Sequence, residues 1–117
     1  MPEAWDRLCI DIEQAVKSYH DGYAYKYRER ATAFRKNDCV HIEVASDNNQ
    51  RRALDVCMNR ESMLVFSRKA DGIEVTRMPF SSDDDGNACF KDEHGNLLTM
   101  EQVSELFLYH FLFTENR

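Results

Sequence analysis

The chain has 117 residues, of which 43% are hydrophobic and 31% are charged. This length suits one domain with a core of its own, so we expect a single domain over residues 1–117. The net charge of −6 at pH 7 argues against nonspecific nucleic-acid binding by the whole surface. No apolar run approaches the roughly 20 residues that a membrane-spanning helix needs, so we predict no membrane span.

The first third of the chain has the spacing of a long helix. Gly22 lies inside this run and is the position at which the helix would kink or end, since glycine costs up to ~1 kcal/mol in a helix. A competing interpretation puts Tyr23, Tyr25 and Tyr27 on one face of a strand, because they also alternate. The apolar residues that recur every three or four positions are Trp5, Leu8, Ile12, Val16, Tyr19, Tyr23, Tyr27, Ala31 and Phe34.

From Asp38 the hydrophobic period changes to two, which predicts strands. Asp71 and Gly72 form a hairpin signal, and Pro79 is expected to end the strand that follows it. Short connections favour an antiparallel meander. We therefore predict an α+β fold with the order α-β-β-β-β-(β)-α, in which a four- or five-stranded sheet is flanked by a long N-terminal helix and a C-terminal helix. The expected strands are 40–44, 54–58, 63–66, 73–78 and, as the fifth, 88–91.

The C-terminal helix is expected to begin with a capping box. Thr99 and Gln102 have the spacing at which each side chain can bond to the backbone N–H of the other. Leu98 and Val103 occupy the hydrophobic-staple positions beside them. The helix that follows is apolar on almost every side from Leu106 to Phe113.

A terminal helix of a small protein cannot easily bury its whole circumference in its own core. One stripe is expected to face the core, and it comprises Val103, Leu106, Phe107, His110 and Phe111. The apolar residues away from that stripe are expected at an interface with another chain. These interface residues are Leu108, Tyr109, Leu112 and Phe113.

A second candidate surface is the basic segment 23–36, which holds five cations against one carboxylate and has aromatic residues between them. Cations with aromatics can neutralise phosphates and stack bases. On a helix, the same cations would form an ordinary solvated face. The candidate anion-binding residues are Lys26, Arg28, Arg30, Arg35 and Lys36. The segment 83–105 has the opposite character, with seven carboxylates against one lysine.

Little in the sequence points to catalysis or to a cofactor. Cys39, His41 and Cys57 would share the wet face of the sheet and could form a sparse metal or thiol site. The loop from Ser81 to Asp92 only partly matches a calcium loop, and there is no glycine-rich phosphate loop. We therefore expect no cofactor and no metal. The predicted wet face comprises Cys39, His41, Glu43, Ala53, Asp55, Cys57, Glu74 and Thr76.

The first residues lack the basic start and apolar stretch of a secretory signal, so we expect a cytoplasmic protein whose four cysteines are reduced thiols. The sequence favours a small acidic, non-catalytic protein-binding module of adaptor, chaperone-like or inhibitor-like kind. Its expected partner is another protein chain, and a homodimer formed through the C-terminal helix is the preferred case. The alternative is binding of nucleic acid or another polyanion through segment 23–36.

Overall fold

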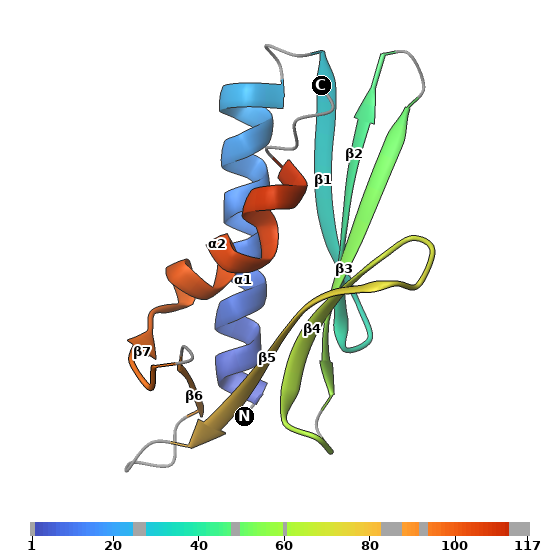
Figure 1. Ribbon diagram of the computed structural model, residues 1–117. Helices are drawn as coiled ribbons and strands as arrows, with labels where there is room; N and C mark the ends of the chain where they lie inside the picture. The colour runs from blue at the N-terminus through green and yellow to red at the C-terminus, as the bar shows by residue number, and fades with distance from the viewer. Residues whose placement is uncertain are drawn as a thin grey trace.

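The computed structural model describes residues 2–24, 28–47, 50–59, 61–82, 88–91 and 94–112. Its fold is α+β, as predicted, with two helices and one antiparallel sheet whose seven strands follow chain order (Figure 1). The prediction of four or five strands was therefore too low. The elements are α1 (Pro2–Tyr19), the π-helical turn η1 (His20–Ala24), β1 (Glu29–Lys36), β2 (Cys39–Ser46), β3 (Arg51–Asn59), β4 (Leu64–Lys69), β5 (Glu74–Ser82), β6 (Ala88–Lys91), β7 (Leu97–Leu98) and α2 (Met100–Leu112).

The predicted long N-terminal helix is wrong beyond Tyr19. Helix α1 ends there, η1 follows, and residues 29–36 form strand β1, which pairs with β2 along its whole length. The two-residue turn that joins these strands has Asn37 at a φ of 57°, a left-handed conformation that asparagine tolerates. The helical spacing of Ala31 was a coincidence, because this residue is buried from a strand. Tyr25 and Tyr27 lie outside the described residues.

The hairpin predicted at Asp71 and Gly72 is confirmed. Gly72 has a φ of 86°, and its N–H donates to the carbonyl of Lys69 at 2.8 Å. The expectation that Pro79 ends the next strand is wrong, since β5 continues to Ser82. Phe80 N–H donates to the carbonyl of Met63, so the neighbouring Pro79 lies where no N–H is needed for the ladder to β4.

A β-bulge changes which residues of β5 face the core. The register between β4 and β5 shifts at Ser67 and Arg68, where Ser67 opposes Thr76 and Arg68 opposes Glu74. Because Ser67 is fully buried, Thr76 lies on the core side, and its N–H donates to the Ser67 hydroxyl at 3.1 Å. The expected position of Thr76 beside Glu74 on the wet face is therefore wrong.

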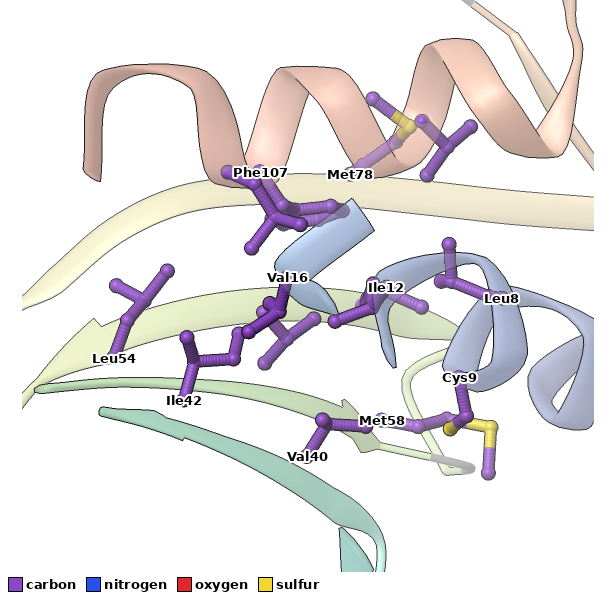
Figure 2. Packing of buried hydrophobic residues seen from close by; sticks show 14 of the residues in the cluster. Leu8, Cys9, Ile12, Val16, Val40, Ile42, Leu54, Met58, Met78 and Phe107 are labelled. Carbon is purple, nitrogen blue, oxygen red and sulfur yellow. The ribbon is translucent and has the colours of Figure 1, made fainter. Parts of the chain in front are cut away.

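The sheet curls around α1, and α2 closes the remaining side. Figure 2 shows Ile12 and Val16 of α1 between Phe107 of α2 and Ile42 of β2. Each of these side chains is at most 4% exposed. The part of the predicted apolar stripe that runs from Trp5 to Tyr19 is thus the buried stripe of α1. Cys9, which was not in the predicted stripe, joins these residues in one core cluster: Trp5, Leu8, Cys9, Ile12, Val16 and Tyr19.

Arg52 of β3 fixes the C-terminal end of α2. Its guanidinium donates to the carbonyls of Phe111 and Leu112, both at 3.1 Å, and so occupies acceptors that a helix end leaves open. The same group donates to Glu29 at 2.9 Å, and Tyr19 donates its hydroxyl to the other oxygen of Glu29 at 2.6 Å. Helix α2 is therefore held at its end by a polar network that joins α1, β1 and β3.

Strand β1 forms one edge of the sheet. The N–H of Ala31 donates to Nδ1 of His20 at 3.1 Å. The π-helical turn η1 places this histidine beside the edge of β1.

Candidate functional site

The capping box sets the start of α2 and therefore the direction of its faces. Thr99 N–H donates to the side-chain oxygen of Gln102 at 2.9 Å, and Gln102 N–H donates to the Thr99 hydroxyl at 3.1 Å. This confirms the predicted box. Leu98 and Val103, which the staple would join, both pack against the core cluster.

The structure buries a different arc of α2 from the one that the apolar pattern indicated. Leu108 and Leu112 are 2% and 3% exposed within the chain, whereas Leu106, which was assigned to the core stripe, is 51% exposed. Of the four residues expected at an interface, Tyr109 alone is exposed among those described, at 53%. Phe113 lies outside the described residues, as does the side chain of His110.

Ser104 explains why the arc is rotated. It is only 3% exposed, and its hydroxyl donates to the carbonyl of Met100 one turn earlier at 2.9 Å. A serine that bonds back to its own helix can face a core without an unsatisfied polar group. The predicted core stripe included Leu106 and did not include Ser104, whereas in the structure Ser104 is buried and Leu106 is exposed.

A groove of about 570 Å³ runs between α1 and α2, which cross each other in Figure 1. On each helix the lining residues recur at three and four positions, so that one continuous stripe of each helix forms a wall. The contribution from α1 was missed from sequence, because nothing along the chain shows that these two helices meet. The lining residues are Asp11, Gln14, Ala15, Ser18, Tyr19, Glu101, Ser104, Glu105, Leu108, Tyr109 and Leu112.

A second hollow, of about 400 Å³, adjoins the first on the other side of α2. It is lined by Leu98, Gln102, Glu105, Leu106 and Tyr109. Glu105 and Tyr109 line both hollows, so they form the ridge between them. We call the two hollows and this ridge the α2 outer face.

The α2 outer face combines a buried apolar floor with acidic edges. Tyr19, Leu108 and Leu112, each at most 3% exposed, form most of the floor of the larger hollow. Ser104 is equally buried among them, with its hydroxyl bonded to its own helix. The exposed Glu101 and Glu105 lie along one edge. Asp11, from α1, is half-buried on the other. None of the described residues that line either hollow is lysine, arginine or histidine.

The basic segment is divided by the strand that replaces the expected helix. Alternation along β1 turns Arg30 and Lys36 to the outer face of the sheet and Arg35 toward α1. Arg35 donates to Glu13 at 2.9 Å and to Asp6 at 3.0 Å, and the bond to Glu13 raises the pKa of its guanidinium. Arg28 lies exposed in the turn before β1, and Lys26 is outside the described residues. The described cations therefore do not share one face.

On the outer face of the sheet, Cys39 of β2 and Cys57 of β3 form a disulfide. The expectation that all four cysteines are reduced thiols is wrong for this pair. The disulfide also leaves neither sulfur as the thiolate that a metal or thiol site at Cys39, His41 and Cys57 would require. Cys9 is a free thiol in the core, where burial raises its pKa to about 12.

His41 lies beside that disulfide on β2 and has carboxylates on both ring nitrogens. Nδ1 is 2.7 Å from Asp55, and Nε2 is 3.4 Å from Glu43. The centroid of the ring also lies 5.1 Å from that of Phe34, with the two ring planes tilted by 46°. Across the part of the chain that the structure describes, no three His, Cys, Asp or Glu side chains are grouped so that they could hold a metal ion.

Comparison of the chain with protein-family models, with curated proteins and with solved structures gives no match. Neither of the helices that the structure describes is both long enough and apolar enough to span a membrane.

Proposed function

We propose that this chain is a non-catalytic protein-binding module, of adaptor, chaperone-like or inhibitor-like kind, that contacts another protein through the α2 outer face. The observation that carries the proposal is the exposure of Leu106 and Tyr109 on a helix whose opposite side is buried. Both residues border hollows that an incoming side chain can fill. Exposed aromatic side chains beside such pockets are the kind of anchor that dominates binding energy in protein interfaces.

Self-association through α2, as a homodimer, is the second candidate. The exposed apolar pair favours it, because two copies could cover each other's Leu106 and Tyr109. The acidic edge counts against it, since a two-fold contact would bring Glu101 and Glu105 of both copies together. We therefore favour a partner of different sequence over a second copy.

Polyanion binding through the basic segment has less support. Arg35 is engaged with two carboxylates of α1, and the described cations lie on different faces. A labelled oligonucleotide at low salt should show no shift with this protein. A shift that weakens steeply as salt is added would favour this alternative instead.

The proposal is tested with a photoreactive amino acid placed at position 106 or 109 in the cells from which the sequence comes. We expect each position to give a discrete adduct with another protein. Val75 is the matched control, because it is 54% exposed and apolar but lies on β5. The adduct formed from position 109 should disappear when Leu106→Asp is added. Adducts of equal yield from position 75, or none from 106 and 109, would contradict the proposal.

Light scattering of the purified chain separates the two candidate partners. A monomer is expected at all accessible concentrations if the partner has a different sequence. A dimer that dissociates in the Tyr109→Asp variant would establish self-association instead. Because Tyr109 is half exposed, this substitution should leave the fold intact, and circular dichroism is the control.

The Cys39–Cys57 disulfide bears on the expected cytoplasmic location. Structural disulfides belong to oxidising compartments, so a cytoplasmic location requires this pair to be reduced in the cell. Alkylation of thiols in intact cells before lysis measures this directly. Two modified cysteines at positions 39 and 57 would support a cytoplasmic location. A pair that resists alkylation until a reductant is added would exclude it.

A further inference from the structure

We infer that the groove between α1 and α2 binds a basic amphipathic helix of the partner protein. This inference rests on the proposed function and adds the chemical class of the partner. It starts from the eleven described residues that line the larger hollow, three of which are acidic and none basic.

The distribution of charge across the groove is what selects the partner. The floor is mainly apolar, with Leu108 and Leu112 almost fully buried, and the one buried serine among them, Ser104, bonds to its own helix. Carboxylates stand at both edges, Asp11 on α1 and the pair Glu101 and Glu105 on α2. A segment that fills this groove must therefore present apolar side chains downward and cations on both flanks, which is the pattern of a basic amphipathic helix.

The dimensions agree with a helix of a few turns. The lining residues of α2 extend from Glu101 to Leu112, which at 1.5 Å per residue is a length of about 16 Å. The stripe on α1, from Asp11 to Tyr19, covers about 12 Å. Both walls are helical surfaces with ridges three and four residues apart, and a third helix packs its own ridges between them.

A second copy of this chain is a poor occupant. The described part of α1 exposes Arg7 and Lys17 together with Asp6, so its solvent side is mixed in sign. The exposed edge of α2 is itself acidic. Neither described helix offers the apolar side flanked by cations that the groove requires.

The test uses a synthetic amphipathic peptide of about fourteen residues, or roughly four turns, with leucines on one side and lysines on both flanks. Its two controls replace every lysine with glutamate or every leucine with serine. Amide chemical shifts of the isotope-labelled protein report where each peptide binds. The basic peptide should shift the amides of Gln14, Ala15, Ser104 and Glu105 and should bind more weakly as salt is added. Both control peptides should bind far less.

Glu105→Lys should lower the affinity for the basic peptide by about fivefold, since it turns one attractive contact into a repulsive one. The matched control is Glu61→Lys, which makes the same change of charge at an exposed position in the connection between β3 and β4. That variant should stay within about twofold of the parent.

Equal binding of the lysine and glutamate peptides would overturn the charge assignment, as would shifts confined to the outer face of the sheet or no binding of any peptide. In each of these cases, adducts from positions 106 and 109 in cells would still support the protein-binding function. The function itself fails if those adducts are absent, whatever the peptides do.

Discussion

Arg52 joins the end of α2 to the interior of the molecule. Its partner Glu29 is 8% exposed, so the ion pair between them lies largely out of water. Removal of one member of such a pair leaves a buried charge without compensation. Removal of the Arg52 guanidinium would also leave the carbonyls of Phe111 and Leu112, at the end of α2, without their donor.

Arg52→Met is expected to lower the free energy of unfolding by about 3 kcal/mol, measured by urea denaturation. Arg51→Met is the control, because that side chain is 73% exposed and lies 3.7 Å from Glu43. It should cost no more than about 0.5 kcal/mol. Adding Glu29→Gln to Arg52→Met should recover part of the loss. If nothing is recovered, the helix carbonyls rather than the buried charge account for the cost.

Because of Cys9, the stability of the fold depends on pH in the alkaline range. Its thiol is neutral when protonated, and burial raises its pKa from 9.0 to about 12 in the folded chain. Its contribution to stability is therefore complete below pH 9 and is lost as the pH rises from 9 toward 12. Between pH 8 and pH 10 the parent should lose about 1.4 kcal/mol more than Cys9→Ala. Parallel pH profiles for the two proteins would refute this.

At the scale of the element, α2 depends on its cap. Thr99→Ala should lower the free energy of unfolding by about 1 kcal/mol, because Gln102 N–H then loses its acceptor. Thr99→Ser retains the hydroxyl and should stay close to the parent. Thermal unfolding followed by circular dichroism compares the three proteins. If alanine and serine are equivalent, the hydroxyl is not what starts this helix.

The cap could be predicted because its signal lies in four consecutive residues, whereas the buried arc of α2 could not. A hydropathy pattern assigns each residue by its own polarity, and Ser104 satisfies its hydroxyl within the helix. That local bond is invisible in the pattern. The core arc was therefore placed one position away, and Leu106 was counted as buried.

The strands from β2 to β6 were predictable from alternation and turn residues, while β1 was not. Residues 29–36 contain helix formers and continue a helical spacing that begins in α1. The contrary signal was Asn37 and Asp38, two residues that favour turns. Pairing with β2 along the whole of β1 then outweighed helix propensity, which is a weak preference for any single segment.

At the scale of the whole molecule, the disulfide between Cys39 and Cys57 closes a loop with a sequence separation of 18. A loop of this length is expected to add about 3 kcal/mol by restricting the unfolded chain. A reductant should therefore lower the melting temperature of the parent, and should leave that of Cys39→Ser/Cys57→Ser unchanged. Identical melting of the parent with and without reductant would show that the bond contributes nothing.

The candidate site is formed by two helices that are distant in the sequence, so the sequence revealed only the α2 half of it. Glu101 and Glu105 stand in a segment whose acidity is evident along the chain. Asp11 and Ala15 lie some ninety residues earlier. Only the closure of the curled sheet brings α1 and α2 together and turns two separate stripes into one groove.

The hydrogen bond from Ala31 to His20 affects how readily the protein aggregates at high concentration. An open margin of a β-sheet invites strands from other molecules, which is how many proteins begin to aggregate. A strand of another molecule that paired with the Ala31 N–H would first have to displace the His20 imidazole. The His20 side chain, from a short π-helical turn, thus protects the Ala31 N–H at this edge of the sheet from pairing with another molecule.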